Sequence, residues 1–160
     1  MAVLFLQNAY ICGMKKPSGY GFYIDKTLKK LQSVYLKAFK DNGIDLTIEQ
    51  WAILHRIYEL GEKASQTEIT KTNYRNRATT SRVIAGLVKK GLVVKEKFEG
   101  DGKRYQLTVT KQGKKIVAKV EPIMYNLREI GVAHIDKNDF QLFLKVLDQI
   151  WTNYDQCDSI

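Results

Sequence analysis

The sequence predicts a mainly α-helical chain that carries one small β-hairpin. Apolar residues recur at helical spacing in five or six segments, and capping signals precede several of these segments. Between residues 92 and 109 the spacing changes to strand-like alternation around the turn sequence GDG. The chain has 160 residues, of which 44% are hydrophobic and 27% are charged. This composition is enough for a buried core and is not that of a disordered segment.

Two helices are expected in the N-terminal part of the chain. The first covers about residues 20–40, and Gly43 supplies a stop signal after it. The second begins at a capping box in which Thr47 and Gln50 bond to each other, and Gly61 ends it. The two helices are therefore joined by a short connection.

A pair of shorter helices follows and leads into the hairpin. Ser65 and Glu68 repeat the capping signal for a helix that ends near Lys71, and the next helix ends at Gly91. Ile84 is expected at the centre of the buried face of this second helix. The residues expected to share that face are Thr80, Val83, Leu87 and Val88. A short helix, a turn, a helix and a hairpin in this order predict a winged helix-turn-helix lobe.

Two further helices are expected after the hairpin. Thr110 caps the first, and Pro122 is expected to bend it or to break it near Glu121. The last helix starts at Asp136 and carries a long apolar stripe. The long N- and C-terminal helices are too apolar to stand alone, so their stripes pack either within one chain or between two chains.

Positive charge is concentrated in the middle of the chain. Residues 66–115 hold thirteen Lys and Arg against four Asp and Glu, and this net +9 equals the formal charge of the whole protein. A localised basic block is the electrostatic footprint of a protein that binds a polyanion. The alternative is a solvated surface with an excess of lysine, which charge alone does not exclude.

No pattern typical of an enzyme, a metal site or a cofactor site is present. Cys12 and Cys157 have no metal-ligand spacing and imply no disulfide framework, which suits a reducing, cytoplasmic environment. His55 lies on an apolar helix and His134 lies in a loop, without partners at catalytic or metal-binding spacing. No phosphate-binding glycine motif occurs, and no apolar run is long enough to span a membrane.

Four stretches in the predicted order resemble the MarR family of bacterial transcriptional regulators. They are LTIEQWAIL, SQTEI, TTSRVIAGLVKKGLV and GDGKRYQLTVTKQGKK, within a resemblance that runs from about Gly19 to Tyr154. The resemblance implies a homodimer on a pseudo-palindromic operator in double-stranded DNA. It also implies an N-terminal tail at 1–18, a helical dimerisation region at 19–46 and 116–160, and a winged helix-turn-helix DNA-binding domain at 47–115.

The helix after the turn is the expected recognition helix. Its outward side combines long cations with very small side chains, which let the backbone approach the major groove while arginine reads guanine. Ile84 on the opposite side sets this orientation, which is also expected to place Gly86 and Lys89 on the outward side. The residues expected to meet DNA from this helix and its entry are Arg75, Asn76, Arg77, Ala78, Thr79 and Arg82. The alternative is an ordinary amphipathic helix with an arginine-rich solvent face.

Two flanking elements are expected to contact the DNA backbone. The start of the first motif helix offers hydroxyls and free amides to phosphate through Ser65, Gln66 and Thr67. The hairpin supplies the candidates Lys95, Lys97, Asp101, Lys103 and Arg104. Asp101 is expected to orient a neighbouring cation, and the resemblance leaves open whether Lys103 or Arg104 enters the minor groove.

Many proteins of the family bind small aromatic or phenolic ligands between the dimer helices and the DNA-binding lobe. The candidate lining residues are Tyr20, Phe22, Tyr23, Tyr35 and Tyr58, with core or dimer-interface packing as the alternative for each. The expected function is that of a sequence-specific transcriptional repressor, released by a small aromatic ligand. The other readings are a ligand-insensitive architectural DNA binder and a winged-helix protein-interaction module.

Overall fold

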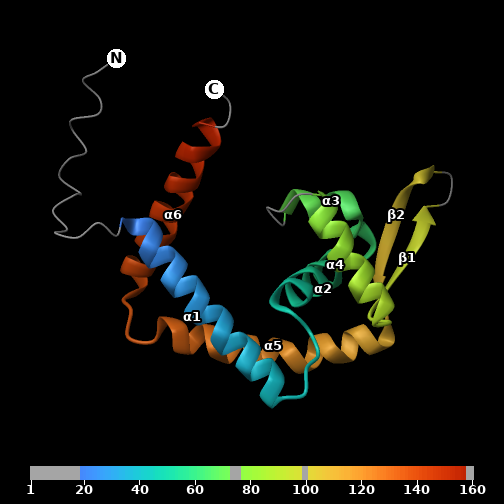
Figure 1. Ribbon diagram of the computed structural model, residues 1–160, viewed down its shortest axis with the longest axis horizontal. Helices are drawn as coiled ribbons and strands as arrows, with labels where there is room; N and C mark the ends of the chain where they lie inside the picture. Colours follow the sequence, from blue (N-terminus) through green and yellow to red (C-terminus); the bar gives the residue numbers. More distant parts are fainter. Residues whose placement is uncertain (1–18, 73–76, 99–100, 158–160) are drawn as a thin grey trace.

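The computed structural model describes residues 19–72, 77–98 and 101–157 (Figure 1). The elements are α1 (Tyr20–Asp41), α2 (Ile48–Leu60), the 3-10 turn η2 (Gly61–Lys63), α3 (Gln66–Thr72), α4 (Arg77–Lys89), β1 (Val93–Phe98), β2 (Asp101–Val109), α5 (Lys111–Val132) and α6 (Lys137–Cys157). The predicted tail at 1–18, Arg75 and Asn76 lie outside the described residues. A mainly helical chain with one antiparallel hairpin confirms the predicted fold class.

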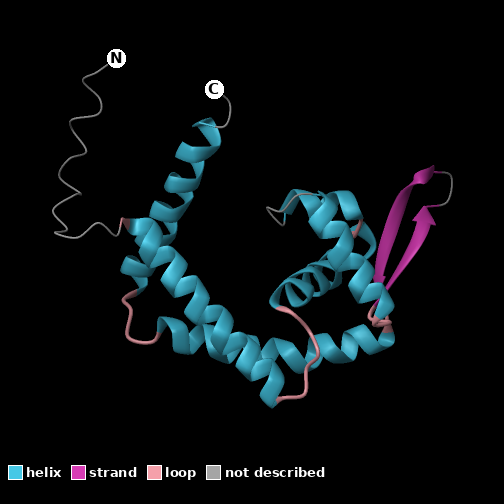
Figure 2. Cartoon of the chain, in the orientation of Figure 1, coloured by secondary structure: helices cyan, strands magenta, loops and turns pink. Residues whose placement is uncertain are grey.

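The elements form a compact lobe and a set of long helices beside it. In Figure 2 the hairpin lies at one edge of the lobe made by α2, α3 and α4. The helix α5 starts next to the base of the hairpin, passes under the lobe and continues along α1, and α6 stands beside the start of α1 (Figure 1). The lobe and the long helices are thus joined by α5 and by the connection between α1 and α2.

Side-chain caps fix where several helices begin, as the sequence predicts. Thr47 Oγ1 accepts a hydrogen bond from Gln50 N at 3.1 Å, and Gln50 Oε1 accepts one from Thr47 N at 3.2 Å. Thr110 Oγ1 accepts from Gly113 N at 3.0 Å at the start of α5. These bonds satisfy N–H groups that have no partner inside the helix.

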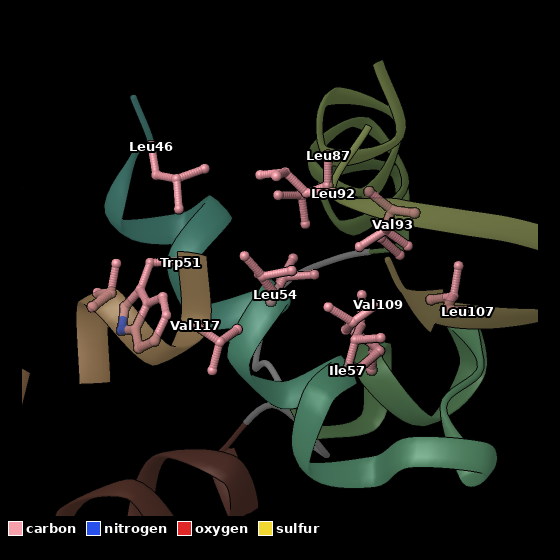
Figure 3. Close-up of a cluster of buried hydrophobic side chains, with 14 of the residues drawn as sticks. Leu46, Trp51, Leu54, Ile57, Leu87, Leu92, Val93, Leu107, Val109 and Val117 are labelled. Atoms are coloured by element: carbon pink, nitrogen blue, oxygen red, sulfur yellow. The ribbon is translucent and has the colours of Figure 1, made fainter. Parts of the chain in front are cut away.

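The core of the lobe is built from residues of its helices, of the hairpin and of α5 (Figure 3). Leu54 on α2, Leu87 on α4, Leu107 on β2 and Val117 on α5 are all at most 1% exposed. The core residues labelled in Figure 3 thus include residues of the α1–α2 connection, α2, α4, the hairpin and the first half of α5. The lobe therefore completes its core with residues of a single chain.

The face of α4 that packs on the core is largely the predicted one. Thr80, Ile84 and Leu87 are buried, whereas Val88 is 38% exposed, so its predicted place on the buried face is wrong. Leu87, in the same last turn of α4, is fully buried, so the core contact at this end of the helix does not reach around to Val88. Gly86, expected on the outward side, faces α2 instead, because a Cβ built on it would lie 3.1 Å from Gln50 Nε2.

The predicted break at Pro122 does not occur, since α5 is one continuous helix from Lys111 to Val132. Proline removes the N–H that would bond the carbonyl of Ala118, four residues earlier. Both residues lie on the exposed side of α5, where water can take the place of the missing donor. The proline is therefore tolerated inside the helix.

The junction between the hairpin and α5 is packed too closely for any side chain at Gly113. A Cβ on that residue would collide with the carbonyl oxygen of Leu92 and would lie 2.6 Å from Val109 Cγ1. Thr110 N donates to Leu92 O at 3.0 Å, and Thr110 Oγ1 donates to Gly91 O at 2.7 Å. The first turn of α5 is thereby fixed to the base of the hairpin.

The connection between α1 and α2 is held from two sides. Lys119 Nζ on α5 donates to Asn42 O at 2.6 Å, and Lys90 Nζ lies 2.8 Å from Asp45 Oδ2. Ile44 and Leu46 anchor the same segment in the core, with exposed fractions of 6% and 7%. The end of α1 is therefore linked to both α5 and the segment after α4.

Candidate nucleic-acid interface

The first candidate element is the start of α3. Ser65 Oγ accepts from Glu68 N at 3.2 Å, which confirms its capping role. Ser65 is half-buried because its backbone pairs with Gln106 of β2 as an isolated antiparallel bridge. Thr67, by contrast, is exposed in the first turn of α3. Because the Ser65 hydroxyl oxygen already accepts a bond from Glu68 N, Ser65 can also bind a DNA phosphate only through its backbone or through the hydroxyl proton.

The second candidate element is the first half of α4. Arg77, Ala78 and Arg82 are exposed, and Ala78 and Arg82 lie one helical turn apart on the same side. Thr79 is half-buried beside them. The expected combination of small residues and arginine is therefore present on the surface of this helix.

The third candidate element is the hairpin. Val93, Lys95 and Lys97 share one face of β1, and Lys97 pairs with Tyr105 before the register becomes irregular. Lys95 and Lys97 are exposed. Asp101, Lys103 and Arg104 lie on β2 next to the turn, and their side chains are outside what the structure describes.

One lysine of the hairpin already has partners inside the chain. Lys95 Nζ lies 4.4 Å from the centre of the Tyr105 ring and donates to Gln66 Oε1 at 3.3 Å. The sequence analysis missed this contact between the hairpin and α3. No sequence signal reveals it, because Lys95 and Gln66 are distant in the chain and are brought together only by the fold.

The charges of these elements differ in how they are compensated. Lys71 on α3 forms an ion pair with Glu68 at 2.8 Å. Arg77, Arg82 and Lys97 form no ion pair within the described residues. Uncompensated, exposed cations on α4 and the hairpin leave a positive potential available to a polyanion.

The five aromatic residues proposed for a ligand pocket do not line one common cavity. Tyr20, Phe22 and Tyr23 lie at the exposed start of α1, beside α6 and away from the lobe (Figure 1). The hydroxyl groups of Tyr20 and Tyr154 are 2.5 Å apart, and this hydrogen bond raises the pKa of Tyr20. Tyr58 lies on a separate, smaller hollow at the end of α2.

Of these five residues, Tyr35 lines a cavity between the lobe and the long helices. The cavity has a volume of about 510 Å³ and is lined by residues of α1, α2, α3 and α5. Its walls include Tyr35, Trp51, Arg56 and Arg128. The Arg56 Nε atom is buried and has no hydrogen-bond partner in the part of the chain that the structure describes, although Arg56 Nη1 lies 3.4 Å from Glu59 Oε2. The cavity thus combines aromatic surface with guanidinium groups and with the carboxylates of Glu49 and Glu59.

Neither histidine belongs to a catalytic or metal-binding arrangement in the described part of the chain. His55 Nε2 lies 3.1 Å from Glu121 Oε1, which joins α2 to α5. No group of three or more potential metal ligands occurs among the described residues. Within those residues no helix is both long and apolar enough to cross a membrane.

Comparison with solved structures identifies the architecture. The S. aureus MepR–DNA complex has 18% sequence identity and a TM-score of 0.78, with 85% of this chain and 98% of that chain covered. A MarR protein from Peptoclostridium difficile has 21% identity and a TM-score of 0.75, with 89% and 92% covered. Bordetella bronchiseptica BpsR, whose DNA binding is regulated by 6-hydroxynicotinic acid, has 16% identity and a TM-score of 0.73, with 84% and 97% covered.

A family model gives the match at the level of sequence. The model of the MarR family matches residues 44–104, which run from the end of the α1–α2 connection to the second strand of the hairpin. The matched segment contains α3, α4 and the hairpin as far as Arg104. Residues 44–104 thus match the MarR family in sequence, and the whole chain has the same fold as these solved structures.

Proposed function

We propose that this protein is a transcriptional regulator that binds double-stranded DNA with sequence specificity as a homodimer. The observation that carries this proposal is the surface of α4, where Ala78 and Arg82 are exposed on one side while Ile84 is 1% exposed on the other. In a winged helix this surface is the one that enters the major groove. Structural similarity to the DNA-bound MepR supports the proposal.

The recognition helix supplies base contacts in this proposal. Arg82 donates two hydrogen bonds to the O6 and N7 atoms of a guanine, while Ala78 and Thr79 allow close approach and contact a thymine methyl group. Arg77 lies at the N-terminus of α4, where recognition helices meet base edges. Arg75 and Asn76 precede it and remain proposed contacts from the sequence alone.

Contacts to the DNA backbone come from α3 and the hairpin. Gln66 and Thr67 lie in the first turn of α3, which presents free backbone amides to a phosphate. Lys97 is exposed and has no partner among the residues that the structure describes, and it neutralises a phosphate. Lys103 or Arg104 enters the minor groove, and Asp101 orients the cation that does so.

The dimer interface is formed by the long helices. Large apolar side chains along them are exposed in the single chain: Leu28 is 49% exposed, Phe143 is 51% exposed and Trp151 is 55% exposed. A contiguous apolar surface of this kind marks a protein–protein interface. We assign dimerisation to 19–46 and 116–160, and DNA binding to 47–115. A second copy would cover the apolar surface and place two lobes on adjacent half-sites.

The cavity beside Tyr35 is the proposed site of a regulatory ligand. Trp51 and Tyr35 offer aromatic surface, and the guanidinium groups of Arg56 and Arg128 suit a carboxylate. A small aromatic acid fits both features, and the regulation of BpsR by 6-hydroxynicotinic acid supports this class of ligand. Binding between α1, α2 and α5 would release DNA if the ligand prefers a different spacing of the lobes.

Selection of binding sites from random duplexes by the purified protein tests the proposed function. We expect enrichment of a pseudo-palindrome whose half-site centres are about one helical turn apart, roughly 34–36 Å. An architectural DNA binder would show little preference between the selected palindrome and random duplex. A protein-interaction module would show no salt-sensitive duplex binding at all.

Titration of salicylate with and without operator DNA tests the ligand. Coupling between the two sites is expected at about 1–3 kcal/mol, and operator must weaken ligand binding by the same factor that ligand weakens operator binding. Replacement of Arg128 by Met is the matched variant, since it removes the guanidinium group and keeps an apolar stem. Equal salicylate affinity in both titrations would contradict the proposed regulation by this ligand, while the proposal of DNA binding would stand.

A further inference from the structure

The hairpin is attached to the start of α3 by a row of contacts. Leu107 N donates to Ala64 O at 2.9 Å, and Gln106 Nε2 donates to Glu62 O at 3.2 Å. One step farther from the core, Lys95 Nζ donates to Gln66 Oε1 at 3.3 Å. The first two contacts join backbone of the segment before α3 to β2. The last one joins a lysine of the hairpin to Gln66, which the proposed function places near the DNA backbone.

Lys95 reaches Gln66 because of its place on the strand. Val93 is buried at 2% exposure, and Lys95 is the next residue on the same face of β1. This face therefore passes from the core to the surface at Lys95, on the side where α3 begins. A long, flexible side chain at that point can cover the gap between the hairpin and α3.

Tyr105 restricts where the Lys95 ammonium group can go. The Nζ atom lies 4.4 Å from the centre of the Tyr105 ring, within the range of a cation–π contact. The ring is partly buried on the opposite strand, diagonal to Lys95, because Tyr105 pairs with Lys97. Lys97 itself has no partner among the described residues. The two exposed lysines of β1 therefore differ in their environment.

The contact determines which side of the Gln66 amide faces outward. A glutamine amide has one acceptor oxygen and an NH₂ group with two donors. With the oxygen directed at Lys95, the NH₂ group is directed away from the hairpin. A donor group is what a phosphate requires, whereas an outward oxygen would repel it.

We propose that Lys95 is a positioning residue for DNA binding rather than a phosphate contact. It holds the Gln66 amide with its donors toward the DNA backbone and fixes the hairpin against α3. The inference rests on the proposed function for its DNA part, whereas the contact itself exists in the free protein. The two parts are therefore tested separately.

The first experiment uses the free protein and needs no DNA. Nuclear magnetic resonance of the Gln66 side-chain NH₂ group is compared between the unmodified protein and Lys95→Met, with Lys97→Met as the matched control. We expect Lys95→Met to move this resonance pair toward the values of a solvent-exposed glutamine, and Lys97→Met to leave it in place. An unchanged Gln66 resonance in Lys95→Met would overturn the inference, whatever the protein does with DNA.

The second experiment measures binding to the selected duplex over a range of salt concentrations. We expect Lys95→Met to weaken binding about 3- to 10-fold, as for one lost hydrogen bond, with an unchanged salt slope. Lys97→Met is expected to lower the slope by about one, as for one lost phosphate contact. Lys95→Arg keeps a cation over Tyr105 and a donor for Gln66, and is expected to restore binding.

The double variant completes the test. In a Gln66→Leu background, Lys95→Met is expected to have little further effect, whereas Lys97→Met keeps its full effect. A slope lowered by about one in Lys95→Met, with additive losses, would make Lys95 a phosphate contact and overturn the inference. Failure of the unmodified protein to bind any duplex would instead overturn the proposed function, while the resonance experiment would still decide the Lys95–Gln66 contact.

Discussion

The winged-helix lobe and the long helices use similar apolar residues in opposite ways. In the lobe, Leu54 is fully buried and Ile84 is 1% exposed. In α6, no described residue is buried, and Phe143 and Trp151 are each more than half exposed. The lobe therefore closes its core within one chain, while the long helices leave theirs open. Under the proposed function, this difference makes the single chain a complete DNA-binding unit that carries one half of a dimer interface.

Truncation in the lobe core is expected to have the largest effect. Leu54→Ala removes a fully buried side chain and should lower the free energy of unfolding by about 2–5 kcal/mol. Leu36→Ala on α1 is the matched control, since Leu36 is 46% exposed. Denaturant unfolding measures both variants. Equal losses would contradict a core that is confined to the lobe.

Charge on the apolar stripe of α6 is expected to break the dimer and spare the lobe. Glutamates in place of Leu144 and Leu147 should raise the dimer dissociation constant at least about 100-fold, because truncating interface anchors costs about 2 kcal/mol or more each. Sedimentation at micromolar concentration measures the change from dimer to monomer. The control is the pair Gln141→Glu and Gln149→Glu, which adds the same charge off the stripe. If the unmodified protein itself sediments as a monomer, the proposed homodimer is contradicted.

Arg82→Ala is expected to reduce discrimination between DNA sequences rather than affinity in general. If Arg82 reads a guanine, the preference for the selected site over random duplex should fall by about 1–3 kcal/mol. Lys97→Ala should weaken both duplexes alike. Competition binding with the two duplexes measures the difference. Equal weakening of both by Arg82→Ala would make Arg82 a phosphate contact.

Removal of a helix cap at the border of the two regions is expected to have the smallest effect. Thr47→Ala deletes the acceptor for Gln50 N and should lower the free energy of unfolding by about 1 kcal/mol. Thr27→Ala, on the exposed surface of α1, is the control and should have less effect. Thermal unfolding compares the two. A larger loss in the control would show that the cap contributes little.

Much of the fold could be predicted from the sequence because its signals are local. Thr47, Ser65 and Thr110 cap helices through bonds to residues three positions later, and such bonds require no knowledge of the rest of the chain. The hairpin is likewise formed by two strands that are neighbours in the sequence and are joined by a short turn. The caps, the helix order and the buried face of Ile84 were therefore predicted correctly.

The errors occur where distant elements meet. Gly86 faces Gln50 of α2, and Val88 is exposed, because packing between helices decides which part of α4 is covered. Tyr20 and Tyr58 lie in different parts of the molecule, although aromatic character alone placed them in one pocket. The contact of Lys95 with DNA stays a prediction, whereas its contacts with Tyr105 and Gln66 are known only from the fold.

The tight junction at Gly113 makes α5 a lever for the hairpin. The 22 residues of this helix extend over about 33 Å. Because no side chain fits at Gly113 and Thr110 is bonded to both Gly91 and Leu92, the junction has little room to absorb a rotation. A tilt of about 10° at the far end would therefore move the base of the hairpin by about 6 Å, given that helix length. A displacement of that size exceeds the spacing between adjacent base pairs of DNA, so a small change among the long helices would be enough to take the wing out of register.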